Sequence, residues 1–511
     1  MIITITDYLK MKDLKSFRYV IYCLFFAVIF VTVFSTSTSP LFNPPISTDS
    51  AVFQLIGKYW ADGFLPYKDF WDHKGPIIYF VNFLGYNFSG NQFGVYIIQI
   101  ISLFISILMA HFYLSHKYTI RQSLLLCFFI LLSLSSNYAD GNKTTEYLLP
   151  LLLVSFLFQY SWLENVIMNR QYEHRFLYSF VYGCTCAFAF LTRLSDIVGL
   201  ICGVFYVYVL LMIKGKWRNL LGNCCFVLLG FIVVSLPFIL YFYSKGILGE
   251  MWYGTIVFNL SYAQRMSNTG LSSEIGLWHL AIRHFNYINA YLLLCIGIWG
   301  LFISKTRKYI SLFFCIIAIP TIIYFFKTAY AAAGYGQIAF PYLVLILLEV
   351  KALKNPRERN VVRKFLICLF LSFVFIKGMH NVYKVVNQMC SNKPNVECET
   401  FQQAVSLIPE NEKDSFLAYN CHADTYLLYD IKPHGRFFTN QDWQISFNPN
   451  LRLKIQDSLI KTQPLWILVK PEQSFNLPIG IMSILEKEYE LRSVLGNYYL
   501  YHHTIFQTHE E

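Results

Sequence analysis

Six side chains stand out in one short polar stretch that follows the first apolar segment of the chain. They are four acids, an imidazole and a lysine: Asp49, Asp62, Asp69, Asp72, His73 and Lys74. A carboxylate can remove the proton of an attacking hydroxyl group, and a lysine can neutralise negative charge that develops on a departing group. Aromatic residues are interleaved with the last four, which is unusual for a solvated turn. We therefore interpret this stretch as the candidate functional site.

Simpler interpretations exist for these residues. The segment Ser47–Ser50 has the form of a helix N-cap, and the amphipathic segment 51–60 after it predicts a helix lying along the membrane surface. At a helix N-terminus the dipole keeps the Asp49 carboxylate ionised, whether it serves as a cap or as a base. Asp72 and Lys74 can equally be a surface ion pair of small energy. The spacing alone leaves these alternatives open.

The composition indicates a membrane protein. The chain has 511 residues, of which 56% are hydrophobic, 18% aromatic and only 14% charged, far too apolar for an ordinary soluble protein. Segments of roughly 17 to 25 apolar residues, each able to cross about 30 Å of hydrocarbon as a helix, recur along the first three quarters of the chain. We expect about eleven spans, near residues 19–36, 92–114, 121–138, 145–162, 176–192, 197–213, 220–243, 287–304, 309–326, 338–350 and 364–380.

The orientation follows from the loops, because cytoplasmic loops attract Lys and Arg. Every second connection is basic, starting with the N-terminal segment, which predicts a cytoplasmic N-terminus. We interpret the first apolar run as a membrane helix rather than a cleaved signal peptide. The loops at 49–91 and 137–146, and the C-terminal segment, are then expected outside. The formal net charge of +11 is largely explained by this pattern, and no nucleic-acid-binding module accompanies it.

The composition changes near residue 381. Apolar runs shorten, and segments such as 415–419 and 464–470 are typical of short buried strands. We therefore predict a transmembrane domain over 1–380 and a small extracytoplasmic α/β domain over 381–511. Cys390, Cys398 and Cys421 lie in this second part, where an oxidising compartment permits a disulfide between two of them; the sequence does not indicate which.

The polar stretch resembles one family. Asp49 after the first span, and Lys74-Gly75-Pro76 before an apolar run, are similar to the essential Asp and the Lys-Pro-Pro-like element of polytopic glycosyltransferases of the GT-C class that use polyprenyl-phosphate sugars. This group contains protein mannosyltransferases and lipid A aminoarabinose transferases. The chain departs from the pattern in two places: Gly75 replaces the first proline, and Asp49 lacks the adjacent Glu found in many members.

Three later segments resemble the same family, so that the resemblance covers roughly residues 1–350. The segment 137–146 is similar to the second external loop, with an acid, Glu146, at the start of the fourth span. The segment 190–196 is similar to the arginine-bearing turn and carries Arg193. The segment 333–342, with Tyr335 and Gln337, is similar to the late external motif, although relatives often have His-Tyr where this chain has Gln-Ile.

The resemblance implies a mainly α, GT-C-like membrane fold with a juxtamembrane helical loop, and a bacterial inner-membrane glycosyltransferase. The donor would be a polyprenyl-phosphate sugar, and the acceptor a glycan, lipid or protein on the periplasmic side. Asp49 would act as general base, with inversion at the anomeric carbon. No metal ligands are predicted, and assistance by a divalent metal is left open. The remaining roles are donor phosphate binding by Lys74 and Arg193, and substrate binding by Asp69, Asp72, His73, Glu146, Tyr335 and Gln337.

Other interpretations remain. Glu146 can merely cap the fourth span, and Arg193 and Asp196 can simply form a turn. A transporter or flippase for lipid-linked glycans also carries ionisable residues in a membrane domain, but there they mark a path within the spans. An O-antigen ligase or polymerase also acts on lipid-linked sugars outside the membrane, typically with a large late external loop and arginines.

Overall fold

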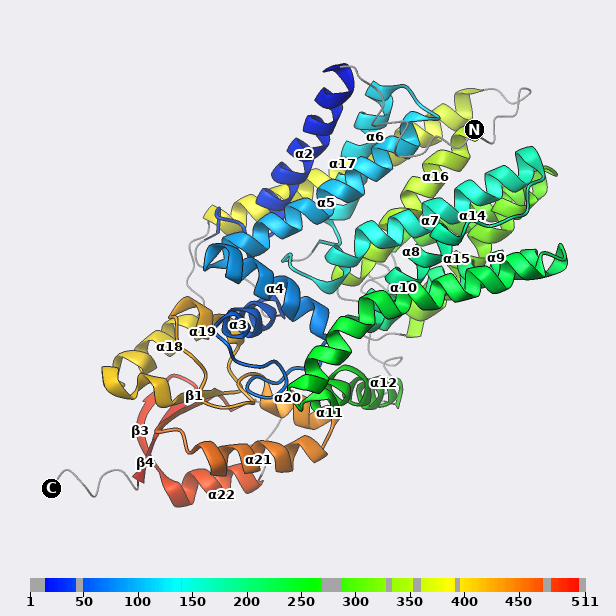
Figure 1. Cartoon of the computed structure of the whole chain (residues 1–511). Helices are drawn as coiled ribbons and strands as arrows, with labels where there is room; N and C mark the ends of the chain where they lie inside the picture. The colour runs from blue at the N-terminus through cyan, green and yellow to red at the C-terminus, as the bar shows by residue number, and fades with distance from the viewer. Residues whose placement is uncertain are drawn as a thin grey trace. The chain divides into compact units, whose positions relative to one another are not determined.

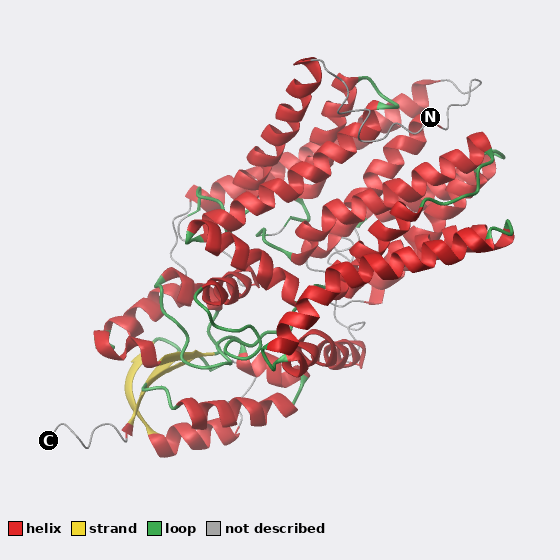
Figure 2. Ribbon diagram, in the orientation of Figure 1, coloured by secondary structure: helices red, strands yellow, loops and turns green. Residues whose placement is uncertain are grey.

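The computed structural model describes residues 14–42, 49–138, 140–268, 287–327, 333–352, 360–390, 396–471 and 479–504. These residues are predominantly helical, with one small sheet of four strands (Figure 2). They divide into two compact units. Unit 1 takes residues 1–35, 96–236 and 272–387, and unit 2 takes residues 36–95, 237–271 and 388–511.

Unit 1 consists of helices, drawn in Figure 1. A helix coincides with every apolar segment expected from the sequence. The helices are α2 (Leu14–Phe34), α5 (Gln92–Ser115), α6 (Ile120–Ser135), α7 (Thr144–Asn169), α8 (Phe176–Phe190), η1 (Leu194–Ile197), α9 (Val198–Ile213), α10 (Trp217–Ser244), α14 (Ile288–Ile303), α15 (Lys308–Lys327), η3 (Ala333–Ala339), α16 (Phe340–Ala352) and α17 (Asn360–Cys390). Short pieces of α5, α10 and α17 belong to unit 2.

Five helical segments of the described chain are long and apolar enough to cross a membrane. They are Phe17–Phe34, Gln92–Ser115, Thr144–Asn169, Leu194–Ile213 and Trp217–Ser244. Four more apolar helices have only 10–17 residues, fewer than the roughly 20 that a helix along the membrane normal needs. The chain is thus a membrane protein with several membrane-capable helices, and the number of about eleven crossings stays a prediction.

Small residues allow close packing in unit 1. A Cβ atom on Gly199 of α9 would lie 2.1 Å from the hydroxyl oxygen of Tyr342, and one on Gly203 would lie 2.4 Å from Oε1 of Gln159. A side chain at either position would require the Tyr342 hydroxyl or the Gln159 amide to move. Close approach at small residues is typical of helix packing in membranes, where water supplies no driving force between helices.

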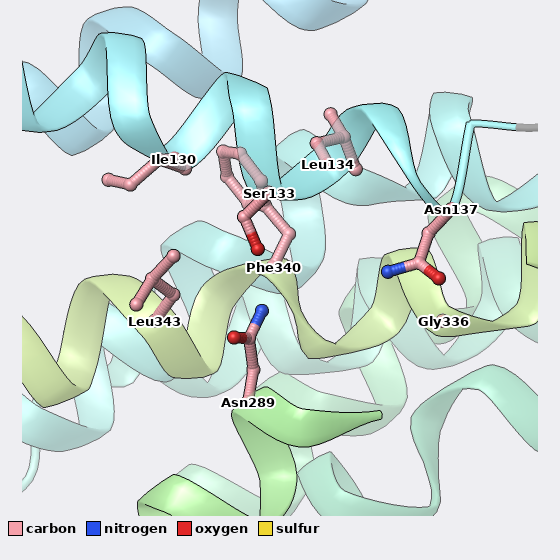
Figure 3. Close-up of a pocket in the computed structure, with 8 residues that line it drawn as sticks. All are labelled: Ile130, Ser133, Leu134, Asn137, Asn289, Gly336, Phe340 and Leu343. Atoms are coloured by element: carbon pink, nitrogen blue, oxygen red, sulfur yellow. The ribbon is translucent and has the colours of Figure 1, made fainter. Parts of the chain in front are cut away.

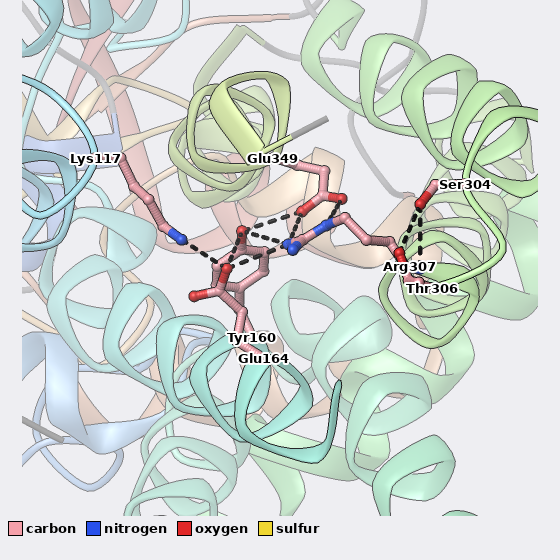
Figure 4. A network of polar contacts seen from close by, with 7 residues as sticks. All are labelled: Lys117, Tyr160, Glu164, Ser304, Thr306, Arg307 and Glu349. Atoms are coloured by element: carbon pink, nitrogen blue, oxygen red, sulfur yellow. Dashed lines mark hydrogen bonds and ion pairs between the residues drawn. The ribbon is translucent and has the colours of Figure 1, made fainter. Parts of the chain in front are cut away.

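A buried ionic network ties four parts of unit 1 together (Figure 4). Arg307, in the connection before α15, donates from Nε to Oε1 of Glu349 in α16 at 2.5 Å, and from Nη2 to Oε1 of Glu164 in α7 at 3.2 Å. Lys117, between α5 and α6, donates to the same Glu164 oxygen at 2.8 Å. The Tyr160 hydroxyl donates to Glu349 Oε2 at 3.1 Å. Every charge in this network therefore faces one of opposite sign.

Unit 2 combines helices from three chain segments with the sheet. The sheet has the order β1-β2-β4-β3, with β1 and β2 parallel and the other pairs antiparallel. Its elements are α3 (Asp49–Ala61), α4 (Pro76–Ser89), α11 (Leu248–Trp252), the π-helix η2 (Tyr253–Val257), α12 (Phe258–Asn268), α18 (Val396–Ser406), η4 (Glu410–Ser415), β1 (Phe416–Tyr419), α19 (Ala423–Leu428), α20 (Gln441–Phe447), α21 (Asn450–Thr462), β2 (Trp466–Val469), α22 (Ile479–Glu488), β3 (Tyr489–Leu495) and β4 (Tyr498–His503).

The predicted helix after the first span is present, because α3 begins at Asp49. Its surroundings differ from the expected amphipathic surface helix: ten of its 13 residues are buried. It packs closely on α4, since a Cβ atom on Gly57 would lie 2.5 Å from the Asn82 Cβ. A helix covered on nearly all sides packs as a core element of its unit.

The C-terminal segment has the predicted α/β character, with β1 and β2 at the two expected strands. Cys398 and Cys421 are free thiols, and burial raises the pKa of Cys398 to about 12; the side chain of Cys390 lies outside the described residues. The compact units cut the chain in several places, whereas the domain division expected from the sequence cuts it once, near residue 380. That division stays a prediction.

Candidate functional site

The loop between α3 and α4 carries most of the predicted site residues in a folded form. Its first half is a tight turn in which Asp69 Oδ2 accepts the backbone N–H of Leu65 at 2.7 Å, and the Asp69 N–H donates to the Leu65 carbonyl at 2.9 Å. Within this turn Tyr67 adopts φ 67°, a left-handed conformation that is costly for a bulky residue. Asp69 therefore holds the shape of the loop.

The second half of the loop forms a chain of polar contacts, and Asp72 and His73 in it are only 7% and 9% exposed. Asp72 Oδ1 lies 2.9 Å from Nδ1 of His73, and Nε2 of the same ring lies 2.9 Å from Nζ of Lys74. The Tyr79 hydroxyl donates to Asp72 Oδ2 at 2.7 Å. The sequence alone brings these residues close, because Gly75 and Pro76 start α4 and set Tyr79 in its first turn.

The electrostatics keep Asp72 ionised and His73 neutral. Burial alone would raise the pKa of Asp72, but the His73 and Lys74 groups and the Tyr79 hydrogen bond outweigh it and hold that pKa below its usual range. Burial and the charge of Lys74 lower the pKa of His73, against the opposite effect of Asp72 and Asp49. An ionised carboxylate thus adjoins a neutral imidazole that contacts an ammonium group.

Asp49 is the first residue of α3 and is exposed. Its negative charge contributes to the pKa of His73, so its carboxylate is electrostatically coupled to the polar chain. The structure thus brings together Asp72, His73 and Lys74 in unit 2, and the Asp49 charge acts on the same imidazole.

Side chains from distant parts of unit 2 enclose the His73 ring. Phe258 and Trp443 have ring centroids 5.2 and 5.5 Å from it. The Asn259 side-chain amide donates to the His73 carbonyl at 2.6 Å, and the Trp71 backbone N–H donates to the Arg436 carbonyl at 2.9 Å. The sequence analysis missed Asn259 and Trp443, since neither belongs to a motif and only the tertiary fold brings them to the loop.

A second set of predicted residues lies in unit 1. Glu146, in the first turn of α7, is 5% exposed. Its Oε1 accepts the Lys143 backbone N–H at 2.9 Å, and its Oε2 accepts the side-chain amide of Gln99 at 2.7 Å. The contact with Lys143 is a capping interaction. Glu146 therefore caps α7, as the simpler interpretation expected, and it also joins a buried polar cluster.

Arg193 is paired within its own turn. Its Nε donates to Asp196 Oδ1 at 2.5 Å, and its Nη2 donates to the Thr145 hydroxyl at 3.2 Å. The Thr145 hydroxyl in turn donates to the other Asp196 oxygen at 3.0 Å. The turn that joins α8 to η1 is thus fixed against the start of α7.

Gln337 is fully buried in η3, with its amide nitrogen 3.5 Å from the Tyr138 carbonyl; the side chain of Tyr335 lies outside the described residues. A small hollow without room for a water molecule lies beside this segment (Figure 3). It is lined by Ile130, Ser133, Leu134, Asn137, Asn289, Gly336, Phe340 and Leu343. Oδ1 of Asn289 is buried there without a hydrogen-bond partner among the described residues.

No group of three or more His, Cys, Asp or Glu side chains in the described part of the chain is arranged to hold a metal ion. The polar residues Asp72–Lys74 offer other chemistry: Asp72 is an anionic acceptor, the His73 ring contacts both neighbours, and Lys74 is a cation. Such a set can bind and orient an anionic group or fix a charge beside a reacting centre. Fold and site together define the class: a helical membrane protein with a buried acid–imidazole–lysine chain.

The comparisons with known proteins give a weak structural likeness. No family model matches the chain, and no curated protein does. Solved structures of the Archaeoglobus fulgidus oligosaccharyltransferase are similar: the apo form and the form tethered with an acceptor peptide both have a TM-score of 0.44 and 12% identity. The apo comparison covers 88% of this chain and 69% of that one. The form with zinc and sulfate has the same TM-score and 13% identity.

Proposed function

We propose that this protein is a membrane glycosyltransferase that transfers a sugar from a polyprenyl-phosphate donor to a glycan, lipid or protein acceptor. The observation that supports the proposal is the chain Asp72–His73–Lys74, with the carboxylate of Asp49 coupled to the same imidazole. This transfer needs a base for the acceptor hydroxyl and a cation for the departing phosphate. One unit offers both.

In the proposed reaction Asp49 accepts the proton of the acceptor hydroxyl as its oxygen bonds to the anomeric carbon. The bond from that carbon to the phosphate oxygen breaks, and the phosphate leaves with the electron pair and its negative charge. Lys74 stabilises this charge. Attack opposite the leaving group predicts inversion at the anomeric carbon.

The other predicted residues take supporting roles in this proposal. Arg193, which contacts Asp196 and Thr145, is the second phosphate partner, the role that the resemblance of the segment 190–196 to the arginine-bearing turn implies. Asp69, Asp72, His73, Glu146, Tyr335 and Gln337 contact or shape the substrate region. The reaction takes place on the periplasmic face of a bacterial inner membrane, with the N-terminus in the cytoplasm, as the basic loops predict.

The test is transfer of radiolabelled sugar from membrane lipid-phosphate donors by purified protein. We expect Asp49→Asn to lower the transfer rate by about 10² to 10⁴ while donor binding is retained. Asp62→Asn is the matched control, since Asp62 is an exposed acid directly after the last residue of the same helix. Undiminished transfer by Asp49→Asn would remove this residue from catalysis. No transfer by the wild type across a broad donor panel would favour a transporter.

A further inference from the structure

The backbone of Lys74 is held from both sides. Its carbonyl accepts the Tyr67 hydroxyl at 2.7 Å, and its N–H donates to the Tyr79 hydroxyl oxygen at 3.1 Å. Tyr67 and Tyr79 are themselves fully buried. The Lys74 side chain therefore starts from a fixed point, and only its own torsions decide where the ammonium group lies.

The side chains of Asp72, His73 and Lys74 differ in which hydrogen-bond donors and acceptors they have, and these capacities decide where the protons lie. An ammonium group has donors only, so Nε2 of His73, 2.9 Å from Nζ of Lys74, must present its lone pair. A neutral imidazole then carries its proton on Nδ1, which lies 2.9 Å from Oδ1 of Asp72. An ionised carboxylate only accepts, and its other oxygen is occupied by the Tyr79 O–H. The approach of Nδ1 to Asp72 is a charge contact: it does not meet the geometry of a hydrogen bond, and Nδ1 has no hydrogen-bond partner among the described residues. The Asp72 carboxylate therefore stabilises the Nδ1 proton through its charge.

The charge of Lys74 is not cancelled by a carboxylate. Within the described residues its ammonium group contacts the neutral imidazole and forms no ion pair. The carboxylate of Asp72 is separated from it by the width of the ring. A cation held by a neutral acceptor keeps its charge available for an anion.

We propose that Asp72 and Tyr79 hold His73 as its Nδ1-protonated neutral tautomer, and that His73 in this form presets the Lys74 ammonium as a binding site for a phosphate group. That this phosphate belongs to a prenyl lipid rests on the proposed function. Asp72, Tyr79 and His73 are positioning residues here, because they act through Lys74. Since the lysine loses its rotamer freedom before the ligand arrives, the site binds phosphate more tightly than a free lysine would.

The tautomer is tested first, by ¹⁵N NMR of histidine-labelled protein in bilayers near pH 7.5, with His73 assigned by its absence in His73→Gln. We expect a neutral ring protonated on Nδ1 in the wild type. In Asp72→Asn we expect the proton to move in part to Nε2, as replacement of the acid does in an Asp–His pair of a catalytic triad. An imidazolium, or a proton on Nε2 in the wild type, would overturn the proposal. This readout does not require sugar transfer, so it can fail or succeed independently of the proposed function.

The consequence for binding is tested by calorimetry with farnesyl phosphate and, separately, inorganic phosphate. His73→Phe keeps a ring but removes the acceptor, and we expect it to weaken binding about tenfold or more. His73→Gln retains an amide oxygen that can accept from Lys74, and should recover much of the affinity. Asp62→Asn is the control and should bind as the wild type does.

The outcomes distinguish a lipid-linked phosphate from free phosphate, and loss of the His73 acceptor from loss of packing. Binding of farnesyl phosphate alone supports a lipid-linked donor, and equal binding of both probes supports the preset site but not the lipid source. Unchanged affinity in His73→Phe and Asp72→Asn, with both proteins folded, would contradict the positioning role. Equal weakening by His73→Gln and His73→Phe would assign the effect to packing rather than to the acceptor.

Discussion

The imidazole of His73 responds to charges of both signs, which makes it a sensitive residue of the site. Burial and Lys74 disfavour its protonated form, whereas Asp72 and Asp49 favour it. The net effect lowers its pKa, so the folded protein binds this proton less readily than the unfolded chain does. The same sign holds for Asp72, whose pKa also lies below its usual range.

Because the pKa values of His73 and Asp72 are lower in the folded protein than in the unfolded chain, we expect the protein to lose stability on acidification. The contribution of neutral His73 to the free energy of unfolding is fully present above the unfolded pKa of about 6.5 and diminishes as the pH falls below that value. The contribution of ionised Asp72 is lost at lower pH, below about pH 4. We expect the melting temperature of the wild type to fall between pH 7.5 and pH 5 more steeply than that of His73→Gln, which cannot titrate there. Thermal unfolding of both proteins across this range measures the difference. Parallel curves would show that His73 does not carry this dependence.

Two acids expected to contact substrate have backbone partners. Asp69 accepts the Leu65 N–H in its turn, and Glu146 accepts the Lys143 N–H at the start of α7. Each contact stabilises a local conformation, which short-range sequence patterns can predict. Contact of either acid with substrate stays a prediction.

At the scale of elements, the π-helix η2 decides which side chains reach the site. A turn of π-helix holds one residue more than an α-helical turn and shifts the register of the helix after it. Beyond this turn Asn259 and Phe258 face His73, and Thr255 within it lies 3.5 Å from the Tyr67 hydroxyl. Nothing in the composition of this segment distinguishes a π-helix from an α-helix, so the sequence could not predict these contacts.

The ionic network of unit 1 holds four elements through a few charges, and its removal should be costly. In Arg307→Met the Glu349 carboxylate, 1% exposed, loses its ion-pair partner. We expect a loss of about 3–5 kcal/mol, the usual effect of leaving a buried charge unpaired. Reversible denaturation in detergent or bilayers measures it.

The double variant Arg307→Met/Glu349→Leu is the informative comparison, because replacing both members of a buried pair is far less harmful than removing one. Lys216→Met is a control, since Lys216 only pairs with the exposed Glu173 at 3.5 Å. A double variant no more stable than Arg307→Met would contradict the ion-pair explanation.

At the scale of the whole molecule, apolar pattern predicts helices better than it predicts crossings. Every expected apolar segment is helical, yet α6, α8 and α14 are shorter than a straight span requires. The helix α4 lies where no span was expected. Strands β1 and β2 are continuous apolar runs and were predictable, whereas β3 mixes charged and apolar residues and was not.

In the candidate site, too, some contacts could be predicted from the sequence and others could not. Asp72, His73 and Lys74 are consecutive, so their proximity could be predicted from the sequence. The enclosure by Trp443 depends on unit 2 being assembled from segments far apart in the chain, and a single sequence holds no record of that pairing. The C-terminal segment, whose role the sequence leaves open, thus supplies a wall of the site.

This assembly predicts an effect of the C-terminal segment on the proposed activity. In Trp443→Ala the His73 ring loses a neighbour and gains access to water, so the pKa of His73 should move up toward its ordinary value as burial weakens. We expect donor binding to weaken several-fold near pH 6.5 and to recover at higher pH. Trp252→Ala is the control, because Trp252 is 50% exposed. Equal binding by both variants at every pH would contradict the prediction.

The enclosure of α3 has a further consequence for Asp49. Because ten of the 13 residues of this helix are buried, its backbone amides can exchange hydrogen with water only when the surrounding unit opens, except in the first turn, whose amides have no acceptor within the helix. Slow exchange would therefore begin one turn after Asp49. In the proposed reaction, the exposed Asp49 carboxylate would thus meet the acceptor from the first residue of a helix whose later turns stay closed.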